Sequence, residues 1–259
     1  MNEIKLVSYN LDHSSKKNKL VQNIRKLSLL GTNIFCFQEI RTGNPDEFIG
    51  NAILDALGSD WKGEFLISEN SKNDYGLGII WNSSELELDN FQALDFPLLP
   101  QLFHLDRLVE QYLLSGDATP VKRAALIATF QINGQQFRLS NVHADWHGGF
   151  EHRFNQIQFL LNHLKTSDIK SEIICGDFNT IGLFRSYKQI KKIQELLGSE
   201  FINFFPKHRI TSIHGQRLDH VFARNFNQNS AKVHLMLGSD HFPIMVSMTL
   251  DNTEKDSEL

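Results

Sequence analysis

Short apolar runs, each followed closely by a polar side chain, recur along this chain of 259 residues. The runs have the length and composition of buried strands, and they lie at residues 4–9, 34–37, 137–142 and 173–175. The polar side chains that follow them are, in the same order, Asn10, Glu39, His143 and Asp177. Because strand ends gather at one edge of a sheet, we expect these side chains to share a single site.

Helices are predicted between the strands because apolar residues recur there at intervals of three and four. The first is expected to follow a cap at Ser14 or Ser15, and the second to begin at Asn44-Pro45, where a cap precedes a proline. The predicted helices cover residues 20–30, 44–58, 98–114, 150–164 and 186–197.

Further strands are predicted from short apolar and β-branched runs. Asn133-Gly134 stands between two such runs and predicts a tight hairpin, whereas residues 82–97 show no clear pattern. The additional strands lie at residues 65–68, 77–81, 126–132, 218–223, 233–237 and 244–250. Helices that alternate with strands, some of them in hairpins, predict a mixed α/β sandwich rather than a purely parallel sheet.

Composition indicates a globular protein, with 41% hydrophobic and 22% charged residues. The length suits one large core, so we expect a single domain over residues 1–250 and a polar, disordered tail over residues 251–259. The formal charge of −4 argues against a dedicated duplex binder, although a local basic rim can still bind phosphate.

Location is predicted from what the sequence lacks. No basic segment followed by an apolar stretch opens the chain, and no run of eighteen apolar residues occurs, so we expect a cytoplasmic protein without a membrane span. The two cysteines, Cys36 and Cys175, each lie in an apolar run and are expected to be buried, reduced thiols.

Two short motifs indicate hydrolysis of a phosphoester. Metal-assisted attack by water needs a base, acidic groups that hold a cation, and a neutral donor to the phosphate oxygens. Ser239-Asp240-His241 and Gly176-Asp177-Phe178-Asn179 contain residues of all three kinds. Each residue alone would be an ordinary turn or surface residue, so the prediction depends on the whole set.

The ordered set of motifs resembles the endonuclease/exonuclease/phosphatase superfamily over nearly the whole chain. The resemblance implies a four-layer α-β-β-α sandwich with two mixed, mainly antiparallel sheets, as in DNase I-like proteins. The motifs are Ser8-Tyr9-Asn10, Gln38-Glu39, Asn141-Val142-His143, Gly176-Asp177-Phe178-Asn179, Arg217-Leu218-Asp219 and Ser239-Asp240-His241.

The resemblance also implies a metal site made of oxygen ligands. Glu39 would be the principal ligand, and Asp240 and Asn10 would complete the shell. Such ligands suit Mg²⁺, with Mn²⁺ as a substitute.

Roles in the reaction follow from the same resemblance. His241 would contact the phosphate or activate water, Asp219 would orient His241, and Asp177 would orient or deprotonate the water. Asn179 would donate to a phosphate oxygen, and Arg123 would contact the substrate phosphate. The sequence leaves open whether Asp177 or His241 is the base.

His143 separates two branches of the superfamily. A histidine here resembles the branch that includes DNase I-like nucleases, sphingomyelinases and inositol-phosphate phosphatases, in which it acts as an acid or clamps the phosphate. The apurinic-endonuclease branch typically has Trp-Asn in the first motif, whereas this chain has Tyr9-Asn10.

We therefore predict a monomeric, Mg²⁺-dependent phosphodiesterase whose substrate is nucleic acid. One alternative keeps the site and changes the substrate to a phospholipid or an inositol phosphate. A second alternative, from a different class, is a non-catalytic binding protein that keeps the fold.

Overall fold

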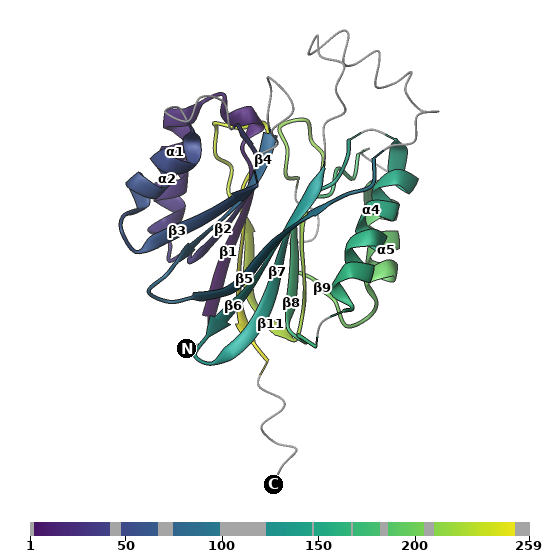
Figure 1. Cartoon of the computed structure of the whole chain (residues 1–259). Coiled ribbons are helices and arrows are strands. Elements are labelled where there is room, and N and C mark those ends of the chain that lie inside the picture. The colour runs from purple at the N-terminus through teal and green to yellow at the C-terminus, as the bar shows by residue number, and fades with distance from the viewer. Residues whose placement is uncertain are drawn as a thin grey trace.

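The computed structural model describes residues 3–41, 48–66, 75–98, 123–146, 148–166, 168–181, 186–204 and 210–251. Within these ranges two six-stranded sheets pack face to face, and a pair of helices covers the outer face of each sheet (Figure 1). This arrangement confirms the predicted α-β-β-α sandwich with two mixed, mainly antiparallel sheets.

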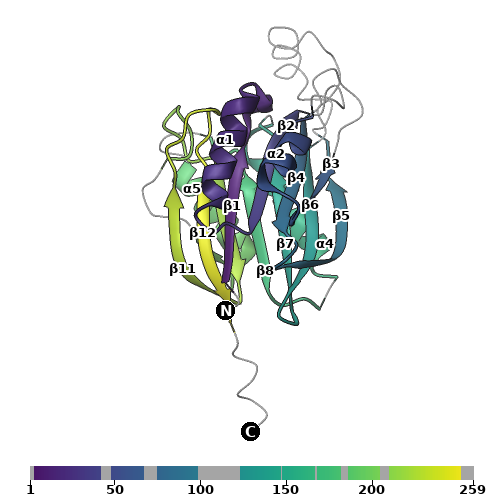
Figure 2. The same cartoon turned by 90° about the vertical axis from the view of Figure 1, so that its left-hand side faces the viewer.

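The first sheet has the strand order β11-β12-β1-β2-β4-β3. β1 and β2 are parallel, and every other neighbouring pair is antiparallel. Figure 2 shows β1 between β12 and β2, so the first and last strands of the fold lie side by side. The strands are β1 (Glu3–Asn10), β2 (Ile34–Arg41), β3 (Trp61–Leu66), β4 (Tyr75–Asn82), β11 (Phe226–Val233) and β12 (Ile244–Leu250).

The second sheet has the order β5-β6-β7-β8-β10-β9 and again contains one parallel pair, β7 with β8. Its strands β6 and β7 form the hairpin that Asn133-Gly134 predicted. The strands are β5 (Glu87–Asp95), β6 (Ala124–Ile132), β7 (Gln135–His143), β8 (Glu172–Asp177), β9 (Ile202–Asn203) and β10 (Asp219–Arg224).

The helices pack through one apolar face each. In α1 (Lys17–Ser28) the buried residues Leu20, Ile24 and Leu27 recur at helical spacing and pack on the first sheet together with α2 (Ile49–Leu57). On the other side, α4 (Gly149–Leu164) and α5 (Ser186–Leu197) cover the second sheet. Among the residues that the structure describes, no helix is both long and apolar enough to cross a bilayer.

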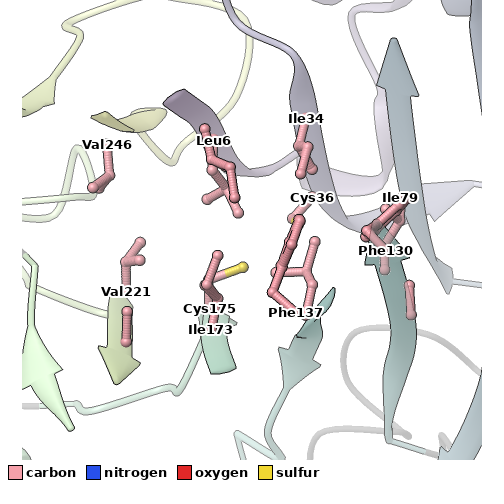
Figure 3. Close-up of a cluster of buried hydrophobic side chains, with 14 of the residues drawn as sticks. Leu6, Ile34, Cys36, Ile79, Phe130, Phe137, Ile173, Cys175, Val221 and Val246 are labelled. Atoms are coloured by element: carbon pink, nitrogen blue, oxygen red, sulfur yellow. The ribbon is translucent and has the colours of Figure 1, made fainter. Parts of the chain in front are cut away.

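The core between the sheets is apolar, as Figure 3 shows for side chains that face one another from the two sheets. Cys36 and Cys175 meet there as fully buried free thiols, which confirms the expectation for both.

A polar bridge crosses this core near the edge where the parallel strands end. Asn141 of β7 donates from Nδ2 to the carbonyl oxygens of Phe37 (2.9 Å) and Gly78 (3.0 Å) in the first sheet. Its Oδ1 accepts a hydrogen bond from Gln38 Nε2 at 2.6 Å. An unpaired buried amide is costly, so this network fixes how the two sheets align.

The edge strands were the hardest to predict. The strand expected at residues 233–237 is wrong, because the chain instead forms β11 at Phe226–Val233, whose residues are mostly exposed and polar. β5 was missed for the same reason: it lies at an edge and buries little. β3 begins at Trp61 rather than at residue 65.

The first helix, α1, begins at Lys17 and ends at Ser28 rather than at residue 30, and its expected cap is absent. No side chain caps α1, and Ser14 Oγ instead accepts a hydrogen bond from Arg41 N (3.2 Å). The predicted helix start at residues 44–47, all but the first residue of the helix predicted at residues 98–114, and nearly all of the tail lie outside the described residues.

Gly176 permits the close approach of β8 to β7. Its φ is +134°, and a Cβ at this position would collide with the carbonyl oxygen of Val142. Gly134 in the hairpin turn also has a positive φ of +77°, but a Cβ there would meet nothing within 4 Å. Substitution at Gly134 therefore tests backbone strain alone, whereas substitution at Gly176 adds a steric collision.

We expect Gly176→Ala to lower the free energy of unfolding by about 3 kcal/mol or more, because strain and collision add. Gly134→Ala should cost only about 1 kcal/mol, the penalty of a left-handed backbone. Urea denaturation of both variants tests this. Equal losses would show that the contact with Val142 relaxes without cost.

Candidate active site

The two parallel pairs bring four predicted site residues to one edge of the sandwich. Asn10 is the last residue of β1, His143 the last of β7 and Asp177 the last of β8, while Glu39 lies near the end of β2. Asn10 Nδ2 donates both to Glu39 Oε1 (3.2 Å) and to Asp177 Oδ2 (3.0 Å), so one amide links the two sheets.

Glu39 is aimed into the site by an irregularity in β2. The register with β4 shifts between Phe37 and Ile40, and Glu39 has a φ of +55°. Bulges of this kind redirect a side chain beside an active site. The Glu39 side chain is 16% exposed, with Oε1 3.6 Å from His143 Nε2.

The charge on Glu39 is held by its neighbours. Burial favours the neutral acid, but the hydrogen bond with His13 and the electrostatic effects of His143, His13 and Arg123 outweigh it. Together they keep the pKa of Glu39 well below its usual value, so the group is a carboxylate at neutral pH.

The surroundings of Asp177 shift its pKa in the opposite direction from that of Glu39. Its Oδ1 accepts a hydrogen bond from Asn179 N (2.8 Å), and its Oδ2 lies 3.8 Å from His241 Nε2 and 3.9 Å from His143 Nε2. Burial, together with the negative charge of Asp219, raises the pKa of Asp177 to about 7, although His241 opposes the shift. A carboxylate with this pKa can exchange a proton at neutral pH.

His241 and Asp219 form the expected carboxylate–imidazole pair, with His241 Nδ1 2.8 Å from Asp219 Oδ2. Burial alone favours the neutral ring, but the charges of Asp219 and Asp177 and this hydrogen bond raise the pKa of His241 well above its usual value. The ring is therefore protonated, and its Nε2 faces Asp177.

His143 has a different protonation state. Arg123 Nη1 lies 2.9 Å from His143 Nδ1 and 3.1 Å from Nε2. Burial and the Arg123 charge lower the pKa of His143 well below its usual value, so the ring is neutral. The positively charged Arg123 and the neutral His143 ring thus lie side by side at the strand ends.

Two predicted residues lie less centrally. The Asn179 side chain donates from Nδ2 to the carbonyl oxygen of Ala144 (3.0 Å), which ties the β8 loop to the β7 loop. Asp240 lies at the rim with its side chain 35% exposed, and its Oδ1 is 3.9 Å from His241 Nε2.

The sequence did not single out two residues that join the site, Asp12 and His13. They belong to the short turn η1 (Asp12–Ser14) after β1, and His13 Nδ1 lies 2.9 Å from Glu39 Oε2. Ligand atoms of Asp12, His13 and Glu39 all lie within 4.8 Å of one another. The turn has no spacing motif, so only its position next to Asn10 could have pointed to it.

The donors at this edge fit a hard divalent cation. Glu39 and Asp12 offer carboxylate oxygens within 4.8 Å of each other, and oxygen ligands are what Mg²⁺ and Mn²⁺ prefer. Asn10 instead faces Glu39 with its amide nitrogen, while its Oδ1 accepts a hydrogen bond from Asp12 N. Burial and the negative charges of Asp240 and Glu39 raise the pKa of Asp12. The three carboxylates repel one another, and a bound cation would relieve that repulsion.

Comparison with known proteins decides the family. A sequence model described as "Endonuclease/Exonuclease/phosphatase family" matches residues 7–241. The chain belongs to the endonuclease/exonuclease/phosphatase family. Members of this family are hydrolases, among them nucleases and phosphatases, and they generally use a divalent metal ion.

Curated relatives are similar in sequence to about half of this chain. A UPF0294 protein of Vibrio parahaemolyticus is 33% identical over 132 residues, which cover 50% of this chain and 46% of the relative. A UPF0294 protein of Vibrio cholerae is 30% identical over 134 residues, with the same shares. The matched region thus spans about half the length of these relatives.

Solved structures of other proteins share the fold. An endonuclease/exonuclease/phosphatase from Bacteroides vulgatus has a TM-score of 0.73 at 14% identity, covering 97% of this chain and 100% of its own. The human Nocturnin catalytic domain gives 0.69 at 16% identity, covering 96% and 95%. A mannosyl-6-phosphatase of Bacteroides thetaiotaomicron gives 0.70 at 16% identity, covering 95% and 100%.

His220, next to Asp219, faces away from the site. Its ring is fully buried between Phe178 and Phe222, and Nε2 lies 3.1 Å from Thr180 Oγ1. Burial, with Arg217 nearby, lowers the pKa of His220 well below its usual value. The folded protein therefore keeps this ring neutral while the unfolded chain can protonate it.

We expect this ring to make the fold sensitive to acid. Below about pH 6.5 the unfolded state binds a proton that the folded state does not, so stability falls by at most about 1.4 kcal/mol per pH unit. His220→Phe removes that proton and should lose less stability between pH 7 and pH 5. Urea denaturation at both pH values measures the difference, and identical losses would contradict it.

Proposed function

We propose that this family member is a Mg²⁺-dependent phosphodiesterase that hydrolyses nucleic acid by in-line attack of water. The observation that carries the proposal is the position of Asp177. It is buried, has a pKa of about 7, and lies within 4 Å of both His143 and His241. A base between two imidazoles suits proton transfer beside a phosphate.

Glu39, with Asp240 and Asn10, would hold the cation, and Mn²⁺ can replace Mg²⁺. When bound, the cation neutralises charge on the phosphate and on the oxygens of the transition state. The low pKa of Glu39 supports its role, because a carboxylate that stays ionised binds metal at neutral pH.

Asp177 accepts the proton of the attacking water in this scheme. The raised pKa of His241 favours its protonated form, so Asp177 is better suited to be the base. His241 instead donates from Nε2 to a phosphate oxygen, while Asp219 holds its orientation and charge. Asn179 has a second amide hydrogen beyond the one given to Ala144, and it donates to the same phosphate group.

His143 and Arg123 bind the phosphate from the other side. Since His143 is neutral, it is better suited to clamping a phosphate oxygen by hydrogen bonding than to protonating the leaving group. Arg123, next to it, adds a positive charge. This pair supports assignment to the histidine-containing branch of the family.

We also propose a monomeric, single-domain protein over residues 1–250 in the cytoplasm. One continuous core from β1 to β12 supports the single domain, and two reduced thiols in that core suit a reducing compartment.

A phospholipid is the second candidate substrate, because exposed apolar side chains flank the site. Leu235 and Leu237 are each 74% exposed, and Ile213, on the adjoining loop, is 53% exposed. Ile213 N donates to the carbonyl oxygen of Asp240 (2.8 Å), which places this loop against the rim. Such residues can contact an acyl chain.

The substrate test is incubation of supercoiled plasmid with the protein and Mg²⁺, with and without EDTA. We expect nicking that EDTA abolishes and that Asp177→Asn lowers by about 10²–10⁴-fold, because the proposed base is lost. Asp55→Asn, on the exposed face of α2, is the matched control and should keep full activity. An intact plasmid would reject nucleic acid and make phospholipid vesicles the next substrate.

Metal binding separates an enzyme from a non-catalytic binding protein. We expect Mg²⁺ to raise the melting temperature of the wild-type protein, because a ligand that binds only the folded state stabilises it. Glu39→Gln should remove this shift. A wild-type protein that shows no shift and no heat of Mg²⁺ binding would favour the non-catalytic alternative.

A further inference from the structure

The turn after β1 holds an unusual backbone conformation. Asp12, His13 and Ser14 have φ values of +46°, +56° and +57°, and none of the three is glycine. Consecutive left-handed residues are strained, and they persist only where surrounding contacts fix them.

Hydrogen bonds to both neighbouring strands fix this turn. Asp12 N donates to Asn10 Oδ1 (3.0 Å), and Leu11 N donates to the carbonyl oxygen of Gln38 (2.9 Å). At the far end Arg41 N donates to Ser14 Oγ (3.2 Å). His13 is therefore held against β2 at the position of the Glu39 bulge.

Glu39 turns its two oxygens in different directions. Oε1 faces Asn10 and His143, whereas Oε2 lies 2.9 Å from His13 Nδ1. Two ligands at right angles on an octahedral ion, each about 2.1 Å from it, lie about 3 Å apart. The spacing of Nδ1 and Oε2 matches that value.

Charge at this corner favours a cation. Asp12 lies close enough to Glu39 and Asp240 to be repelled by both, and His13 opposes that repulsion. The His13 side chain as a whole is 45% exposed, while its Nδ1 is buried against Glu39.

We propose that His13 is a nitrogen ligand, through Nδ1, of the cation that Glu39 holds, and that the site consequently prefers a first-row transition cation such as Mn²⁺ over Mg²⁺. The inference rests on the proposed function, which requires a cation at Glu39. The physical reason is that imidazole nitrogen binds transition ions well, whereas Mg²⁺ favours oxygen ligands.

The test compares Mn²⁺ and Mg²⁺ binding to the full chain and to His13→Asn. Asparagine tolerates a left-handed backbone, so the turn should survive. His214→Asn is the matched control, because His214 lies at the rim with Nε2 4.0 Å from Asp240 Oδ2 and is outside the His13 turn. Mn²⁺ affinity is measured by loss of the free-ion EPR signal, and Mg²⁺ affinity by calorimetry.

We expect His13→Asn to weaken Mn²⁺ binding by about tenfold or more while Mg²⁺ binding changes far less. Electron spin echo spectra of bound Mn²⁺ should show ¹⁴N coupling in the wild type and in His214→Asn, and lose it in His13→Asn. Equal losses for both cations, or no ¹⁴N coupling, would overturn the assignment and leave His13 as a hydrogen-bond partner of Glu39. Absence of binding by either cation would instead reject the proposed metal-dependent function, and this inference with it.

Discussion

The hydrogen bonds of Asn141 across the core are the interaction on which the site depends. Asn141 projects from β7 and donates hydrogen bonds to two carbonyl oxygens of the opposite sheet. Gln38 in turn donates to the amide oxygen of Asn141. A slide of one sheet over the other would leave several buried polar groups unpaired. Glu39 directly follows Gln38, and His143 follows Asn141 by two positions. The same bonds that align the sheets therefore help to set the distance between Glu39 and His143, the proposed metal ligand and the proposed phosphate-binding histidine.

Within the aligned sheets, burial and neighbouring charges give chemically similar side chains different protonation states. Glu39 and Asp177 are both poorly exposed carboxylates, but His13 and Arg123 keep one ionised while Asp219 pushes the other towards a proton. His143 and His241 are both buried imidazoles, and the first is neutral beside Arg123 while the second is charged beside Asp219. These differences supply what the proposed reaction needs, namely an ionised ligand, a base, a hydrogen-bond clamp and a cationic donor.

The sequence could predict those parts that depend on apolar pattern. Strand ends carrying Asn10, His143 and Asp177 follow from buried runs, and the parallel pairs bring them together as expected. β5 and β11 could not be predicted, because an edge strand exposes much of its surface and needs little apolar alternation. The contact between His13 and Glu39 depends on left-handed torsions in the turn and in β2, which apolar pattern does not encode. Asp240 was expected within the metal shell, and it lies nearer the solvent than Glu39.

The pairing of β1 with β12 has a consequence for biosynthesis. Residues 3–8 pair with residues 244–249, so β1 cannot gain this partner strand until β12 has left the ribosome. Asn10 is the last residue of β1. Ser239, just before β12, donates its hydroxyl hydrogen to the carbonyl oxygen of Asn10 (2.7 Å). Until residues 239–249 are made, β1 lacks its pairing with β12 and Asn10 lacks the hydrogen bond from Ser239. The edge of the sandwich that carries Asn10 is therefore completed only when β12 pairs with β1.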